Sequence, residues 1–189
     1  MSGYYKTNND VGVFGRISFL IFIVVLGIES ARQTVARLKK GRRMEELEQF
    51  ALNDSMTGMY NRNAYDYFVK NEKDFEGYVI VTFDLNNLKQ CNDQYGHRAG
   101  DEYIINAAHI IEDNFERYGK CYRIGGDEFC CIIPKGRYFK IERVMHKIDQ
   151  DVEILNHKNI IPVPVGIAYG YAVFTADDTD PEKVRERAD

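Results

Sequence analysis

The sequence lacks several features by which other classes of protein are recognised. It has no basic excess: 25 lysines and arginines stand against 29 aspartates and glutamates, a net charge of −4, so nucleic acid is a poor candidate partner. Its four cysteines form no CxxC pair and no zinc-site spacing, so we expect buried, reduced thiols in a cytosolic domain. A glycine-rich Walker motif is also absent. The hydrophobic share of 44% suits one compact domain with an appendage.

The N-terminal part carries a long apolar run. Residues 17–28 are almost all large and apolar, and residues 11–15 extend the run beyond Arg16. A bilayer-spanning helix needs about 20 such residues, so we expect a transmembrane segment over about 11–28. Basic residues crowd its C-terminal side, which places the rest of the chain in the cytoplasm. A signal peptide and a buried amphipathic segment are the alternatives, although the basic n-region and A-x-A site of the former are lacking.

Residues 29–52 form a polar, helix-favouring stretch without proline. Apolar residues fall on heptad positions in two groups separated by Gly41, namely Ile28, Ala31, Val35 and Leu38, then Met44, Leu47 and Ala51. This pattern predicts a short parallel coiled coil with a phase shift near Gly41. A single amphipathic helix packed on the domain is the alternative. We therefore divide the chain into a tail with a transmembrane segment (1–28), a signalling helix (29–52) and a folded domain (53–189).

The folded domain alternates strand-like and helix-like patterns. Helices are predicted near 61–75, 99–118, 138–155 and 181–188, and strands near 78–83, 121–124, 129–133 and 163–173. Gly125 and Gly126 join the second and third strands, where we expect positive φ angles in a tight hairpin turn. The order β-α-β-β-α-β predicts an α+β fold of the ferredoxin-like kind, with a mixed sheet and helices on one side.

Three acidic residues follow or join predicted strands. Asp84 closes the strand over 78–83, and Asp127 and Glu128 lie at the hairpin turn. If these strands are neighbours, three carboxylates meet at one sheet edge, where Mg²⁺ or Mn²⁺ would join them for phosphoryl or nucleotidyl transfer. The alternative is that Asp127 and Glu128 are ordinary residues of an exposed turn.

The residues after Asp84 are a candidate nucleotide site. A strand ends in a loop and a short helix there, so backbone amides could cradle phosphate and Lys89 would add positive charge. Glycines at 96 and 100 flank His97, which lets the backbone approach a ligand closely. Asp101 has an alternative role as an ordinary helix cap.

Four ordered motifs resemble the GGDEF family of diguanylate cyclases. Residues 54–62 resemble its D-x-L-T-x-L-x-N-R opening, and residues 83–93 its F-D-[ILV]-D-x-F-K-x-x-N-D stretch. Residues 96–101 resemble its G-H-x-x-G-D loop, and residues 125–129 read G-G-D-E-F. The resemblance covers about 54–189 and implies a nucleotidyl-cyclase palm fold.

The resemblance also implies roles for individual residues. Asp84, Asp127 and the Leu85 carbonyl would hold Mg²⁺ or Mn²⁺, Asp127 would also accept a proton, and Glu128 would support the site. Asn92 and Asp101 would read guanine, because a carboxylate accepts hydrogen bonds from guanine but not from N1 of adenine. The remaining implied substrate contacts are Asn87, Leu88, Lys89, His97, Arg123, Gly125 and Gly126. Two subunits, each holding one GTP, would form cyclic di-GMP and two pyrophosphates as a homodimer on a bacterial cell membrane, or in the cytoplasm if the apolar run does not span it.

The chain also departs from the family pattern. Asn86 stands where many members carry a second aspartate, and Leu88 where phenylalanine is usual. Members continue beyond the position of Asp189 with a helix whose lysine and arginine bind phosphate, so we expect a truncated domain. These departures favour an alternative, a degenerate module that binds GTP as a regulatory ligand without turnover. A hybrid cyclase that also accepts ATP is a third hypothesis, disfavoured by Asp101.

Overall fold

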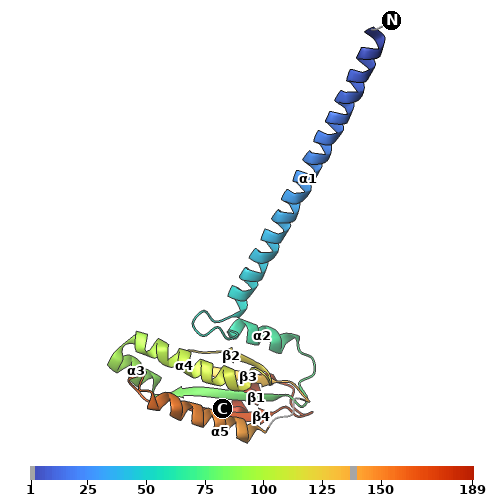
Figure 1. Cartoon of the computed structure of the whole chain (residues 1–189). Helices are drawn as coiled ribbons and strands as arrows, with labels where there is room; N and C mark the ends of the chain where they lie inside the picture. The colour runs from blue at the N-terminus through green and yellow to red at the C-terminus, as the bar shows by residue number, and fades with distance from the viewer. Residues whose placement is uncertain (1–2, 137–139) are drawn as a thin grey trace. The chain divides into compact units, whose positions relative to one another are not determined.

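The computed structural model describes the backbone of residues 3–136 and 140–189, and the side chains of 15–40, 51–136 and 140–189. The chain divides into two compact units, Met1–Glu48 and Gln49–Asp189 (Figure 1). The first consists of helix α1 (Gly3–Leu52), whose last residues belong to the second unit. The second holds every other helix and strand of the described residues.

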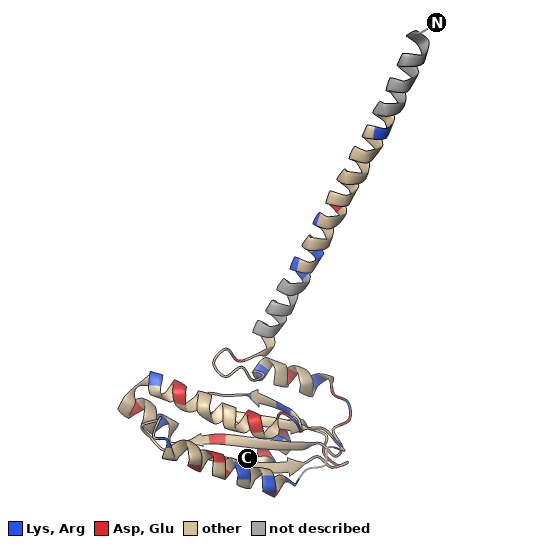
Figure 2. Cartoon of the chain, viewed as in Figure 1, with Lys and Arg blue, Asp and Glu red and all other residues tan. Residues whose placement is uncertain are grey.

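Helix α1 is continuous, so Gly41 does not interrupt the backbone at the predicted phase shift. Its described side chains over 15–40 are all exposed. The segment Gly15–Lys40 is long and apolar enough to cross a membrane, a criterion that a signal sequence also meets. Figure 2 shows few charged residues in its N-terminal half and several lysines and arginines toward its C-terminal end. The heptad positions Met44 and Leu47 lie outside the described side chains.

The second unit is built on four strands: β1 (Val79–Asn86), β2 (Lys120–Arg123), β3 (Glu128–Ile133) and β4 (Gly166–Val173). They form one sheet in the order β2-β3-β1-β4, and all three strand pairs are antiparallel. The prediction of a mixed sheet is therefore wrong. Each helical crossover joins parallel strands, but β3 lies between β1 and β2, and β1 lies between β3 and β4, so every neighbour runs the opposite way.

Both faces of the sheet are covered. Alternate β1 residues Val81, Phe83 and Leu85 enter a core with α3 (Leu88–Tyr95), α4 (His97–Phe115) and α5 (Ile141–His157). Ile80 faces a second core, to which α2 (Arg62–Asn71) and α6 (Pro181–Ala188) contribute. The prediction of helices on one side is therefore wrong, because α2 and α6 cover the opposite face. The α+β, ferredoxin-like arrangement is confirmed.

Element boundaries differ from the predictions at two places near the candidate site. Strand β1 runs two residues past Asp84, because Leu85 and Asn86 pair with Ile167 and Gly166 of β4. Helix α4 begins at His97 with Gly96 as its N-cap, so Asp101 lies within the helix and is not its cap. The predicted helix over 138–155 corresponds to α5, and residues 137–139 lie outside the described part of the chain.

Candidate active site

The register between β1 and β3 brings acidic residues together. Asp84 lies directly opposite Glu128, and the Leu85 amide donates a hydrogen bond of 3.1 Å to the Asp127 carbonyl oxygen. Although the Asp84 side chain is exposed, partial desolvation raises its pKa, and the negative charges of Asp127 and then Asp189 raise it further. The charges that act on the Asp84 carboxylate from the described residues are thus negative, which suits this position to a cation.

The predicted meeting of three carboxylates at one metal site is not found. Among the described residues, no group of three or more His, Cys, Asp or Glu side chains is placed to hold a metal ion. Glu128 folds back over Gly125, where an added Cβ would lie 2.9 Å from Glu128 Oε2. What remains is the pair Asp84 and Asp127 beside the Leu85 backbone. Mg²⁺ commonly binds one or two carboxylates and completes its shell with water and substrate phosphate, so this pair suits it.

The signature turn, residues 124–127, does not use glycine as predicted. Its four residues leave more room than a two-residue hairpin turn, and the amides of Ile124 and Gly125 both donate to the Glu128 carbonyl at 3.0 and 3.2 Å. Neither Gly125 nor Gly126 has a positive φ. A Cβ on Gly125 would press against the Glu128 side chain, 2.9 Å from its Oε2 and 3.1 Å from its Cβ, whereas Gly126 faces open space. The predicted conformational reason is thus wrong for both glycines.

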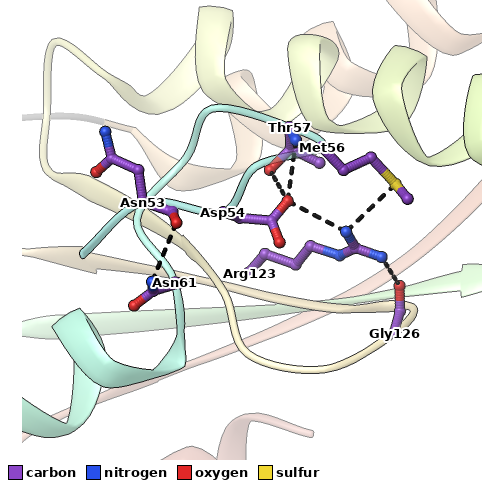
Figure 3. Close-up of polar contacts among 7 residues, drawn as sticks. All are labelled: Asn53, Asp54, Met56, Thr57, Asn61, Arg123 and Gly126. Carbon is purple, nitrogen blue, oxygen red and sulfur yellow. Dashed lines mark hydrogen bonds and ion pairs between the residues drawn. The ribbon is translucent and has the colours of Figure 1, made fainter. Parts of the chain in front are cut away.

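Arg123 holds the signature turn to the segment before α2 (Figure 3). Its Nη2 donates to the Gly126 carbonyl at 2.8 Å, and its Nη1 pairs with Asp54 Oδ1 at 3.1 Å. Thr57 donates to the same Asp54 oxygen from its amide and its hydroxyl, at 2.9 and 2.8 Å. Burial alone would raise the pKa of Asp54, but the bonds from Thr57 and Arg123 outweigh it and lower the pKa. Arg123 was predicted to bind substrate; in the structure both of its terminal nitrogens have partners within the chain.

The segment that carries Asp54 is itself tied down at both ends. The Asn61 side-chain amide donates to the carbonyls of Ala51 and Asn53 at 2.9 and 3.0 Å, while its oxygen accepts the Ala64 amide and caps α2. Tyr60 bridges to the outer edge of β2, where the Arg123 amide donates to its carbonyl at 2.7 Å. The end of α1 is therefore linked through hydrogen bonds to the signature turn. Sequence reasoning missed this function of the 54–62 motif.

Six of the predicted substrate residues, Asn87, Leu88, Lys89, Asn92, His97 and Asp101, lie on α3, α4 and the turn before α3. Asn87 is in the left-handed region, with φ 63°, and turns the chain from β1 into α3. The side chains of Leu85 and Leu88 are buried in the core, so only their backbones can face a ligand. Half-buried Asn92 lies against Gly100, whose missing Cβ leaves space for its amide. The side chains of Lys89, His97 and Asp101 are exposed.

Comparison with known proteins assigns the family. The family model described as "Diguanylate cyclase, GGDEF domain" matches residues 51–189, and the chain belongs to this family. It is 31% identical over 147 residues to the bifunctional diguanylate cyclase/cyclic di-GMP phosphodiesterase MucR of Pseudomonas aeruginosa, covering 73% of this chain and 22% of MucR. It is 27% identical over 145 residues to the probable diguanylate cyclase DgcC of Escherichia coli, covering 74% of this chain and 38% of DgcC. The chain thus spans well under half of these relatives.

Solved structures share the fold. The coiled coil and GGDEF domain of DgcB from Caulobacter crescentus, in complex with c-di-GMP, superimposes with a TM-score of 0.70 at 23% identity over 86% of this chain and 90% of that one. Diguanylate cyclase SiaD of Pseudomonas aeruginosa, in complex with its activator SiaC, gives a TM-score of 0.63 at 21% identity, over 98% and 74% of the two chains.

Proposed function

We propose that this chain is a diguanylate cyclase that condenses two GTP molecules into cyclic di-GMP and two pyrophosphates. The observation that carries the proposal is the Asp84–Asp127 pair beside the complete G-G-D-E-F turn, with the pKa of Asp84 raised by burial and by acidic neighbours. Two carboxylates close enough for the charge of one to raise the pKa of the other are suited to binding a divalent cation together with substrate phosphates.

Asp84, Asp127 and the Leu85 carbonyl would hold Mg²⁺ or Mn²⁺, an all-oxygen set that these hard cations prefer. The bound ion would supply electrostatic stabilisation of the reacting phosphates. The amides that follow Asn87 lie at the start of α3, where helix-terminal N–H groups favour an anion. Exposed Lys89 would add positive charge on the same helix.

Guanine selection would fall on Asn92 and Asp101. Asn92 lies against Gly100, which directly precedes Asp101 on α4. A carboxylate can accept both the N1–H and the exocyclic amine of guanine, whereas N1 of adenine is an acceptor and would leave it unpaired. Exposed His97, at the start of α4, would contact the substrate next to them.

Each subunit would hold one GTP, and two subunits would face each other so that the 3′-hydroxyl of each nucleotide attacks the α-phosphate of the other. Asp127 would accept the hydroxyl proton and Glu128 would support the site. Gly126, which faces open space, would leave the signature turn accessible to the nucleotide. Catalysis would then consist mainly of positioning and electrostatic stabilisation.

The N-terminal helix would anchor and pair the subunits. Its segment Gly15–Lys40 meets the length and composition of a membrane span, and basic residues near its C-terminal end favour a cytoplasmic catalytic domain. Residues 29–52 would form a coiled coil that brings two domains together.

The test is incubation of the purified full chain with GTP and Mg²⁺, with product identified by mass spectrometry and ATP added as a competitor. We expect cyclic di-GMP to form from GTP, and we expect ATP not to reduce the amount of product. The variant Asp101→Asn, which keeps shape but loses the carboxylate, should lose guanine selectivity while the wild type keeps it. Calorimetric GTP binding without any product would instead favour the regulatory-module hypothesis, which Asn86 supports by removing one negative charge near the metal position.

A further inference from the structure

The hydroxyl of Tyr103 is inserted into the end of the ladder between β1 and β4. Asn86 and Gly166 are the last register pair of these strands. The Gly166 amide donates to Tyr103 Oη at 2.7 Å, and Tyr103 Oη lies 2.6 Å from the Asn86 carbonyl oxygen, to which it donates. A side chain from α4 therefore completes the hydrogen bonding of two strands at their edge. Tyr103 is fully buried, so water cannot replace it there.

The β4 side of this bridge is anchored by α5. Asn156 accepts the Val165 amide at 2.7 Å and donates to the Val165 carbonyl at 2.9 Å. These two bonds hold the residue next to Gly166 from both of its backbone groups. A Cβ on Gly166 would lie 3.2 Å from the Asn86 Cβ, so the two backbones approach closely at this pair. The start of β4 is thus a fixed support, and Tyr103 connects Asn86 to it.

On the β1 side, the bridge lies directly before the turn at Asn86–Asn87, whose following amides are proposed to bind phosphate. Asn86 is flanked by Leu85, whose carbonyl is a proposed metal ligand, and by Asn87, whose left-handed conformation turns the chain into α3. The side chains of Leu85 and Leu88 are buried, so the backbone between them has few ways to adjust. A displacement of the Asn86 carbonyl would therefore move both the turn and the Leu85 carbonyl.

We propose that Tyr103 is a positioning residue that fixes the turn at Asn86–Asn87 relative to α4. The inference rests on the proposed function, in which α4 reads guanine through Asp101 and the turn binds phosphate. Tyr103 lies two residues after Asp101 on the same helix, and its hydroxyl holds the carbonyl next to the turn. Tyr103 thereby links the proposed guanine-binding residue Asp101 to the proposed phosphate-binding turn. The distance between these two parts of the site decides how well GTP fits.

The variant Tyr103→Phe in the full chain removes only the bridging oxygen. We expect kcat/KM for GTP to fall about five- to tenfold, the factor that one hydrogen bond typically contributes. The change should lie mainly in KM, because the turn contacts the ground-state phosphates. Tyr65→Phe is the matched control: Tyr65 is equally buried, but it lies in the second core near Glu182 and takes no part in the β1–β4 ladder. Its kinetic constants should stay within about twofold of wild type.

Hydrogen–deuterium exchange supplies a readout independent of activity. The Gly166 amide and the amides of residues 86–88 should exchange faster in Tyr103→Phe than in wild type or Tyr65→Phe. Asn156→Ser, which releases Val165 and leaves Tyr103 intact, should also raise KM for GTP, and it replaces Tyr103→Phe as the test if that variant does not fold.

An unchanged KM in a folded Tyr103→Phe enzyme, or a fall confined to kcat, would overturn the positioning role. Unchanged exchange at Gly166 would overturn the bridge itself. A wild-type chain without cyclase activity would instead refute the proposed function, and the exchange comparison would still decide the bridge.

Discussion

Asp54 offers a sharp test of how the signature turn is held. Asp54→Asn keeps the size of the side chain and removes its charge, leaving the Arg123 guanidinium without its ionic partner. The side chains of Asp54 and Arg123 are only 22% and 11% exposed, and the buried Arg123 Nε has no hydrogen-bond partner among the described residues. Water can therefore compensate the lost interaction only in part.

The magnitude follows from that burial. Breaking one side of a charged hydrogen bond that is mostly buried costs about 1–3 kcal/mol of unfolding free energy. For a domain of this size, each kcal/mol lowers the melting temperature by about 2–4 °C. Asp54→Asn should therefore melt several degrees below wild type. Because Arg123 also holds the Gly126 carbonyl, the signature turn should loosen, and cyclase activity should fall more than the stability loss alone explains.

Thermal unfolding followed by circular dichroism measures the effect, with Asp66→Asn as the control. Asp66 also pairs with an arginine, at 3.0 Å from Arg62, but both side chains are about half exposed, so its loss should cost less than about 0.5 kcal/mol. The pKa of Asp54 is lowered in the folded state, so its contribution is complete above the unfolded pKa of about 3.9 and is lost as pH falls through the folded value. Equal melting temperatures for the two variants at pH 7, or a difference that does not shrink as the pH falls below the unfolded pKa of about 3.9, would refute the reasoning.

Three further substitutions test the site. Asp84→Asn should raise the melting temperature slightly at neutral pH, because a folded-state pKa above the unfolded value means that the ionised carboxylate destabilises the fold. Cyclase activity should drop on the order of 100-fold. A lower melting temperature measured by calorimetry would contradict the stability prediction. Gly100→Ala should leave the fold intact and raise KM for GTP severalfold in steady-state assays, because its Cβ takes the place of the Asn92 amide; an unchanged KM would exclude that role for Asn92. Gly125→Ala should reduce kcat by displacing the Glu128 side chain, and a fully active variant would show that the position of Glu128 is unimportant.

Much of the fold could be predicted from local patterns. Apolar β-branched runs correctly marked β1 and β3, and helical periodicity marked α4 and α5. The order and direction of the strands could not be predicted in this way, because the residue pattern of a strand is the same whether its neighbour is parallel or antiparallel. The second helix layer was missed for a related reason: continuous apolar strands such as β3 are typical of sheets buried on both faces, but the periodicity does not say which helices cover each face.

In the candidate site, too, local features could be predicted from the sequence, whereas contacts between distant residues could not. Asp84 and Asp127 could be paired from sequence because one ends the apolar run of β1 and the other directly precedes β3, and the structure places Asp84 opposite Glu128 in register. The contacts of Arg123 with Asp54, 69 residues apart in the chain, leave no trace in local spacing. The Tyr103 bridge was missed too, because a tyrosine on the apolar face of a helix has the pattern of an ordinary core residue.

The central claim is that Asp127 belongs to a working GTP-condensing centre. The most direct measurement compares cyclic di-GMP formation, by mass spectrometry, from GTP and Mg²⁺ by the dimeric wild-type chain, by Asp127→Ala and by Asp113→Ala, an exposed aspartate of α4. Product from wild type and Asp113→Ala, with none from Asp127→Ala, is the expected result. A wild-type dimer that binds GTP and Mg²⁺ but forms no cyclic di-GMP, or an Asp127→Ala variant that matches wild type, would contradict the claim.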